Sequence, residues 1–169
     1  MHAPTPWWDY HLHEFQIGGL RFGDIDFLTD GDVEDGSRVF DFREVHLRDF
    51  IVGSSFKYLY DFGDGWRHTI IIEAFATEDT KPKSGRCLDG ARARPPEDVG
   101  GSSGYDRFLE IIADQSDPEH EETLLWCGGY FDPEWFDLEL VNKDMRSALR
   151  ANVKRRLHQP KPPKLKVLR

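Results

Sequence analysis

Cysteine and long apolar runs are both scarce in this sequence. The two cysteines, Cys87 and Cys127, are too few for a disulfide framework and are not spaced as a CxxC pair. We expect reduced thiols, with a single bridge between them as the alternative. No apolar run approaches the roughly 20 residues of a membrane span, and no basic segment followed by an apolar stretch opens the chain. These absences predict a cytoplasmic protein without a membrane partner.

The common catalytic signatures are missing as well. The sequence contains no GxGxxG, GxxxxGK[ST], GxSxG or HExxH pattern, and His120-Glu121-Glu122 lacks the second histidine of a zincin. The best-known dinucleotide, nucleotide, hydrolase and zinc-protease sites are therefore not indicated. We predict no cofactor, although a divalent metal stays open, and we leave the existence of any catalytic reaction undecided.

Aromatic residues are abundant instead. Twelve Phe, five Trp and five Tyr make up 13% of the chain, and 38% of it is hydrophobic. Because these side chains bury large areas, a chain of 169 residues with this content can form a hydrophobic core. We predict a single folded domain over residues 1–158 and a basic, proline-containing tail at residues 159–169.

Charge is distributed unevenly along the chain. Residues 143–169 hold ten Lys/Arg and one acidic residue, a net charge of +9. The remaining residues hold 12 Lys/Arg against 30 Asp/Glu, a net charge of -18 within a total of -9. The sequence therefore combines an acidic body with a basic C-terminal segment.

Alternating patterns in the first half of the chain predict strands. Residues 10–17, a Gly18-Gly19 turn and residues 20–23 predict a short hairpin, and residues 38–47 alternate as a further strand. The strongest hairpin signal is Gly63-Asp64-Gly65, because Asp-Gly readily adopts positive φ in a primed turn. The strands that flank this turn are predicted at residues 56–62 and 66–75.

Helical patterns occupy the second half. Ser103 and Asp106 resemble a capping box before one apolar stripe, and Asp117-Pro118 predicts the start of a second helix. Apolar residues every four positions from 141 to 157 predict a third helix, whereas residues 77–101 have no period and predict a long loop. The fold class that follows is α+β, with a mainly antiparallel sheet built on β-hairpins and packed by two or three C-terminal helices.

The hairpin register predicts a contact between two ionisable side chains. If Asp64-Gly65 is a two-residue loop, Asp61 lies directly opposite His68. If the loop has three residues, the partner of Asp61 is Arg67. A carboxylate beside an imidazole would orient the ring as a general base or metal ligand requires, and an ordinary cross-strand ion pair is the simpler alternative.

Residues 95–101 read Pro-Pro-Glu-Asp-Val-Gly-Gly and lead into the first predicted helix. The prolines stiffen this loop and the glycines let its backbone bend, so its two acids have a defined position, although a simple helix-entry turn is the alternative. We predict a pocket between the hairpin and this loop that binds an unknown small ligand or protein. The candidate pocket residues are Asp61, Asp64, Trp66, His68, Glu97, Asp98, Gly100 and Gly101.

Two further hypotheses concern a metal and a nucleic acid. His11 and His13 are two residues apart on a predicted strand, so with His68 and an acid they could ligate the metal of a hydrolase; half-buried polar aromatics are the alternative. The basic helix could contact nucleic acid, but we favour a solvated face or one docked on the acidic body, which would repel phosphates. The basic residues concerned are Arg146, Arg150, Lys154, Arg155 and Arg156.

Several segments resemble the plasmid pRiA4b ORF-3-like family. The resemblance covers most of residues 8–142, and its YDFGD-W-H and PPED-GG motifs are quite specific to that family. The matching segments are HLHEF (11–15), FKYLYDFGDGWRHTIIIE (56–73), CLDGARARPPEDVGG (87–101), GYDRFL (104–109) and FDPEWFD (131–137).

The resemblance implies a compact α+β domain whose hairpin and PPED loop come together. Members of the family are typically of uncharacterised function, occur on bacterial and archaeal plasmids and chromosomes, and in some cases are labelled TnpR-type passenger proteins of mobile insertion elements. Members usually carry an opening strand and helix before the HLHEF-like segment. Since this segment starts here at residue 11, we expect an unpaired sheet edge or an exposed core. The oligomeric state stays open.

Overall fold

The computed structural model describes residues 11–28, 38–75, 85–147 and 158–162. The chain divides into two compact units, each described by itself below. The sheet unit comprises residues 7–82 and 100–102, and the helical unit comprises residues 1–6, 83–99 and 103–169. The single domain expected over residues 1–158 stays a prediction.

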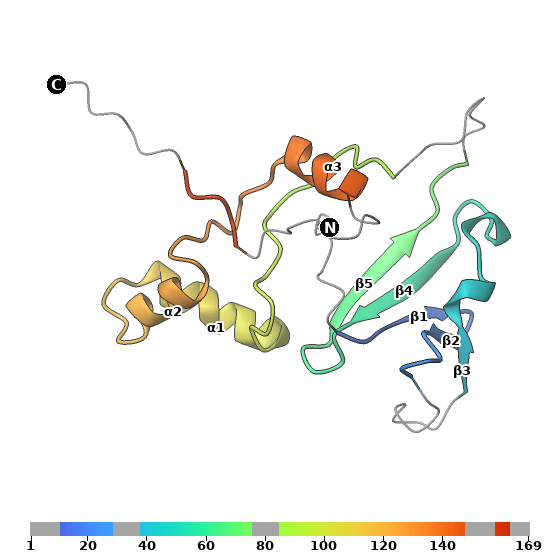
Figure 1. Cartoon of the computed structure of the whole chain (residues 1–169), viewed down its shortest axis with the longest axis horizontal. Helices are drawn as coiled ribbons and strands as arrows, with labels where there is room; N and C mark the ends of the chain where they lie inside the picture. Colours follow the sequence, from blue (N-terminus) through green and yellow to red (C-terminus); the bar gives the residue numbers. More distant parts are fainter. Residues whose placement is uncertain (1–10, 29–37, 76–84, 148–157, 163–169) are drawn as a thin grey trace. The chain divides into compact units, whose positions relative to one another are not determined.

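The sheet unit contains a five-stranded mixed sheet in the order β3-β2-β1-β4-β5 (Figure 1). All neighbouring pairs are antiparallel except β2 and β3, which are parallel. Together with three helices, this sheet confirms the α+β class and both predicted hairpins. The strands are β1 (His13–Ile17), β2 (Leu20–Gly23), β3 (Val39–Asp41), β4 (Ser55–Tyr60) and β5 (Trp66–Ile71).

The strand predicted over residues 38–47 is mostly wrong, because β3 ends at Asp41 and a 3-10 turn follows at Phe42–Glu44. The side chain of Asp41 accepts the backbone N–H of Arg43 at 2.9 Å and so caps this turn. The Arg43 guanidinium also pairs with Asp41, Asp24 and Asp26 at 2.8, 3.0 and 3.2 Å. Local capping by Asp41 therefore outweighs the alternating pattern.

One face of the sheet carries a row of rings that crosses all five strands. Phe40, Phe22, Phe15, Tyr58 and His68 occupy successive register positions from β3 to β5. Their ring centroids lie 5.6 Å apart for Phe22 and Phe40, 5.0 Å for Phe15 and Tyr58, and 5.6 Å for Tyr58 and His68. Because residues directly opposite each other share a face, this aromatic row explains the clustering of aromatic residues in the sequence.

Both registers predicted for the β4-β5 hairpin are wrong. Tyr60 faces Trp66 and Tyr58 faces His68, so residues 61–65 form the connection. The partner of His68 is displaced by three residues from the predicted Asp61. An odd displacement moves a side chain to the other face, and His68 therefore lies in the aromatic row and not beside a carboxylate.

The hairpin closes early because Asp61 leaves the strand. Its backbone has φ of +55°, a left-handed conformation that aspartate tolerates better than most residues. Its Oδ1 accepts the backbone N–H groups of Gly63 and Asp64 at 2.9 and 3.2 Å, and its carbonyl accepts the Gly65 N–H at 2.6 Å. The turn thus starts with a self-capped aspartate, a stronger local determinant than Asp-Gly alone.

The opposite face of the sheet buries a carboxylate on the central strand. Glu14 is 1% exposed. Gln16 Nε2 donates to its Oε1 at 2.6 Å, and Arg21 Nη1 donates to its Oε2 at 3.4 Å. A buried carboxylate requires such partners, so β1 and β2 are joined by this polar cluster as well as by their backbones.

Three helices follow, and none of the helices within the described residues has the length and apolar content needed to cross a membrane. The first predicted helix is confirmed as α1 (Gly101–Ala113). The second, α2 (His120–Trp126), begins later than predicted because Asp117 Oδ1 caps a preceding turn by accepting the Glu119 N–H. The third, α3 (Leu138–Ser147), begins before Val141, and the prediction for residues 148–157 lies outside the described residues.

Side-chain amides hold the irregular segments of the helical unit. Asn142 accepts the Cys87 N–H at 3.0 Å and donates to the Cys87 carbonyl at 2.9 Å. Gln159 makes the same two-way contact with the backbone of Asp132, at 2.8 Å in both directions. Each amide satisfies both the N–H and the C=O of one residue, as a neighbouring strand would. These bonds help to fix the path of irregular segments that lie outside the sheet.

The half-buried position of His68 predicts a pH-dependent contribution to stability. Burial lowers the pKa of His68 below its ordinary value of 6.5, with hydrogen bonds to the Tyr58 and Trp66 backbones opposing the shift. Near this pH the unfolded chain therefore protonates His68 more readily than the folded chain does. The free energy of unfolding falls as the pH decreases below about 6.5.

We expect His68→Phe, which keeps a ring in the row, to flatten that part of the pH dependence in urea unfolding between about pH 7.5 and 5. His46→Phe is the control, because His46 is exposed. An unchanged slope in His68→Phe would show that the ring is solvated in the folded protein.

Candidate functional site

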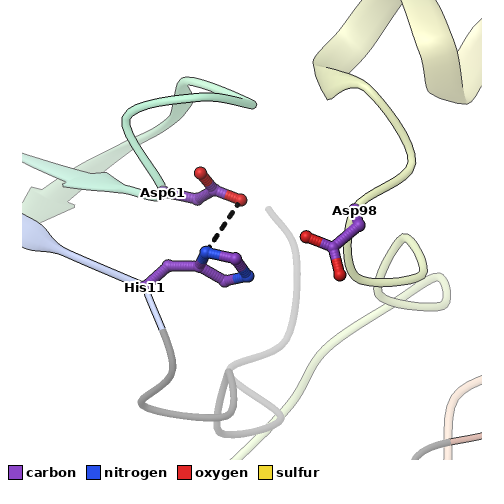
Figure 2. A group of neighbouring side chains, drawn as sticks. All are labelled: His11, Asp61 and Asp98. Atoms are coloured by element: carbon purple, nitrogen blue, oxygen red, sulfur yellow. Dashed lines mark ion pairs between the residues drawn. The ribbon is translucent and has the colours of Figure 1, made fainter.

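The second oxygen of the Asp61 carboxylate faces a histidine. Asp61 Oδ2 lies 3.6 Å from His11 Nδ1, just before β1 (Figure 2). Asp61 is 7% exposed, and the His11 side chain is 29% exposed. The His11 ring also makes a T-shaped contact with the buried ring of Tyr60, with centroids 5.8 Å apart and planes at 88°. The imidazole therefore has a fixed orientation between a carboxylate and an aromatic ring.

The two oxygens of Asp61 have different roles. Oδ1 holds the turn through two backbone N–H groups, whereas Oδ2 pairs with His11. A carboxylate that accepts a hydrogen bond from the Nδ1–H of an imidazole fixes the tautomer and makes Nε2 the basic nitrogen. The pair can therefore present a proton acceptor or a metal-ligating nitrogen, the two chemistries expected of a histidine beside an acid.

A second histidine-aspartate pair provides a comparison. His46 Nδ1 lies 3.7 Å from Asp49 Oδ2, almost the same distance, but the two side chains are 53% and 51% exposed. Exposed pairs of this kind contribute little because water screens them. The His11-Asp61 pair differs in the burial of its carboxylate, which makes it the better candidate for a binding site.

Asp64 connects the hairpin turn to the glycine pair of the PPED-GG motif. Its Oδ2 accepts the Gly100 backbone N–H at 3.3 Å. Gly100 and Gly101 have φ of +90° and +69°, and a Cβ on Gly101 would collide with the Asp64 carbonyl oxygen. Glycine is therefore required at 101 by both conformation and space. These contacts give Asp64, Gly100 and Gly101 structural roles, and the implied meeting of the hairpin with residues 95–98 stays a prediction.

The other predicted pocket residues of the hairpin are on β5. Trp66 and His68 are half-buried and share the face of the aromatic row. His68 faces Tyr58 and not Asp61, so the predicted contact between His68 and Asp61 is replaced by the pairing of Asp61 with His11.

Glu97 and Asp98 belong to the helical unit. Arg94 Nη1 lies 3.0 Å from Glu97 Oε1, with both side chains largely shielded at 12% and 16% exposure. Asp98 is exposed and has a left-handed backbone with φ of +58°. Glu97 therefore balances a neighbouring arginine, and a pocket that joins these acids to the hairpin stays a prediction.

The remaining candidates are a histidine and the basic residues. His13 packs its ring against Phe42 and Tyr58, with centroids 5.8 and 5.7 Å away. Arg146 is exposed near the end of α3, and the nucleic-acid hypothesis stays a prediction. The other four basic residues, Arg150, Lys154, Arg155 and Arg156, lie outside the described residues.

Sequence reasoning found both members of the central pair but assigned each a different partner. His11 was expected to act with His13, and Asp61 with His68. The sequence analysis did not predict that the turn starts at Asp61. The order Asp-Phe-Gly-Asp at residues 61–64 could have indicated it, because an aspartate two residues before a glycine can cap its own turn.

Comparison with known proteins confirms the resemblance. Residues 2–140 match the family described as plasmid pRiA4b ORF-3-like protein. "Uncharacterized protein y4hQ" of Sinorhizobium fredii (strain NBRC 101917 / NGR234) is 42% identical over 132 residues, which cover 76% of this chain and 64% of that protein. The match therefore spans less than two thirds of that relative's length.

A similar fold is found in a solved structure, the protein of unknown function MM3350 from Methanosarcina mazei Go1. The TM-score is 0.64 at 33% sequence identity, over 81% of this chain and 76% of that one. The similarity supports the α+β architecture. Neither relative's name mentions a ligand or a reaction.

The capping role of Asp61 predicts different effects for two substitutions. Asp61→Asn keeps an oxygen acceptor and tolerates positive φ, so we expect a change in unfolding free energy below about 1 kcal/mol. Asp61→Ala removes the acceptor and favours another backbone conformation, with an expected loss of about 2 kcal/mol. Urea unfolding of both variants measures the difference, and equal losses would contradict the capping role.

The close contact at Gly101 predicts that Gly101→Ala lowers the free energy of unfolding. Gly65 serves as the reference position. Gly65 has φ of +68°, matching the +69° of Gly101, but a Cβ there would have no neighbour within 4 Å. We expect Gly65→Ala to cost about 1 kcal/mol from backbone strain, and Gly101→Ala to cost at least about 1 kcal/mol more because it also pushes against Asp64. Thermal and urea unfolding compare them; matching losses would argue against the contact.

Proposed function

This chain belongs to the plasmid pRiA4b ORF-3-like family, and we propose that it acts as a binding module with its ligand site at the turn end of the β4-β5 hairpin. The site is centred on His11 and Asp61. Its ligand is a small molecule or ion, or a side chain of a partner protein, that engages the oriented imidazole.

The observation that carries this proposal is the pairing of a buried carboxylate with a partly exposed imidazole. Asp61 is 7% exposed, whereas the side chain of His11 keeps 29% exposure, so the pair is buried at one end and accessible at the other. If the pair only stabilised the fold, an accessible imidazole would add little to the free energy of unfolding, because water screens the interaction. A binding group needs this combination, because the carboxylate fixes the ring and the ring meets the ligand.

The rigid surroundings of the pair also support a binding role. Asp61 is held by its own turn, and the ring of His11 meets the 1%-exposed Tyr60. Groups fixed before a ligand arrives lose less conformational entropy on binding. The turn that holds Asp61 and the Tyr60 ring beside His11 therefore favour a preorganised pair over two mobile surface side chains.

The backbone of Gly100 also lies at this end of the hairpin. Its N–H donates to Asp64 Oδ2 at 3.3 Å, in the turn that begins at Asp61. We include Asp64 and Gly100 in the proposed site as the groups that support this turn.

A fixed ligand panel tests the proposal through thermal shifts. The panel contains free amino acids, nucleoside monophosphates, polyamines and the chlorides of zinc, manganese, magnesium and calcium. We expect at least one member to raise the melting temperature of the wild-type protein and of His46→Gln, but not of His11→Gln, since ligand binding stabilises only a protein that retains its site.

His46→Gln is a matched control. It makes the same substitution in a histidine whose Nδ1 lies 3.7 Å from an aspartate oxygen, almost the distance found for His11. No shift with any member, or shifts that His11→Gln retains in full, would contradict a ligand site at His11 and Asp61.

A further inference from the structure

We propose that the outer edge of β5 binds an extended, acidic segment of a partner protein, which joins the five-stranded sheet as an additional strand. This surface follows β5 and differs from the ligand site proposed at His11 and Asp61. The partner segment is defined by its chemistry. It carries acidic side chains at alternate positions and apolar side chains between them.

The outer edge of β5 exposes backbone groups that can pair with another strand. β5 is the last strand in the order β3-β2-β1-β4-β5, and within the described part of the chain it pairs with β4 alone (Figure 1). Ile72, just after β5, donates its N–H to the Ser54 carbonyl at 2.9 Å, so its backbone faces the β4 side. Because backbone direction alternates along a strand, the N–H and C=O groups of Arg67, Thr69 and Ile71 face away from β4.

The two edges of the sheet differ in how readily they could accept a further strand. β3 has three residues, and the 3-10 turn at Phe42–Glu44 follows it directly. β5 has six residues, contains neither proline nor glycine, and pairs with β4 in one continuous register. Proteins often protect a sheet edge by a short strand, a proline or a bulge. β3 has the first of these features, whereas β5 has none of them.

The β4-β5 strand pair is basic in an otherwise acidic chain. Its strands contain Lys57 and Arg67 but no aspartate or glutamate, whereas the whole chain has a net charge of -9. Lys57 is directly opposite Thr69, two residues from Arg67, so the two cations share a face. Lys57 Nζ donates to Thr69 Oγ1 at 2.6 Å, which holds the ammonium over β5. An acidic side chain opposite Arg67 or Thr69 in an added strand would therefore lie close to a positive charge.

The other face of β5 favours apolar side chains. It carries Trp66, His68 and Ile70, which are half-buried and share the face of the aromatic row. Successive side chains of an added strand point to opposite faces, so every second one would lie beside these three residues. Apolar groups at those positions would bury surface against β5. The two faces together select a segment in which acidic and apolar residues alternate.

A second copy of this chain is less suited to this edge. Antiparallel pairing of two β5 strands would bring Lys57 and Arg67 of both copies onto one face of the joined sheet, where like charges repel. The net charge of -9 on each chain also opposes association of identical copies. Charge complementarity therefore favours an acidic partner over self-association.

Amide hydrogen exchange, measured by NMR on tag-free, full-length protein, tests whether the edge is open. We expect the N–H groups of Arg67, Thr69 and Ile71 to exchange at least about 100-fold faster than those of His68 and Ile70, which face β4. Slow exchange at all three positions would overturn the proposal, because the edge would already be paired. Slow exchange that disappears on dilution would identify a second copy as the occupant and would equally overturn it.

A synthetic seven-residue peptide in which valine and glutamate alternate is the binding probe. At a free peptide concentration of about ten times its Kd, exchange at Arg67, Thr69 and Ile71 should slow about tenfold. The matched peptide with lysine in place of glutamate should bind at least about tenfold more weakly. Equal binding of the two peptides, or no slowing at any soluble concentration of the glutamate peptide, would overturn the proposal.

Charge-reversal variants locate the binding on the protein. Arg67→Glu should weaken binding of the glutamate peptide by about tenfold or more. Arg38→Glu makes the same change at an exposed residue beside β3, at the other end of the strand order, and should bind as the wild type does. Equal weakening in both variants would show that net charge alone drives binding, which contradicts a specific edge site.

Backbone methylation of the peptide tests strand addition itself. In an antiparallel strand, the residues opposite Arg67 and Thr69 direct their N–H groups toward β5, and in this peptide those residues are the glutamates. Methylation of the glutamate nitrogens should therefore abolish binding, whereas methylation of the valine nitrogens should preserve it. Full binding of both methylated peptides would mean that side chains alone make the contact, and strand addition would be wrong.

Discussion

The structure of the candidate site depends on one constraint, the departure of Asp61 from β4 into a left-handed, self-capped turn. One carboxylate oxygen closes the turn by accepting two backbone N–H groups, and the other faces His11. Because the turn starts at Asp61, Tyr60 faces Trp66 and Tyr58 faces His68. This register determines the face of the sheet on which His68 lies. A single backbone conformation therefore determines both the aromatic row and the histidine-aspartate pair.

The same turn gives a physical meaning to both family motifs. In YDFGD the first aspartate caps the turn, and the second accepts the N–H of Gly100. In PPED-GG the last glycine has no space for a side chain beside the Asp64 carbonyl. The turn of YDFGD and the glycine pair of PPED-GG therefore pack against each other. His11, at the opening of the HLHEF segment, is the residue that we propose for ligand contact.

Much of the fold could be predicted from the sequence, because alternation, glycine turns and helix caps act over a few residues. The first hairpin, α1 and the α+β class followed from such local patterns. The β4-β5 register could not, since a two-residue and a five-residue connection bury different faces and only the capping by Asp61 decides between them. The third helix began early for a similar reason, because Asp137 caps it by accepting the Leu140 N–H. The pairing of His11 with Asp61 joins residues 50 positions apart and follows from no local pattern.

The most direct test of this view is the protonation of the His11 ring, measured through its nitrogen-15 shifts at about pH 9, where histidine rings are neutral. In the wild-type protein we expect the proton on Nδ1, held by Asp61, and in Asp61→Asn we expect that preference to weaken or disappear. If the wild-type His11 carries its proton on Nε2, Asp61 does not orient the ring and the proposed site loses its basis.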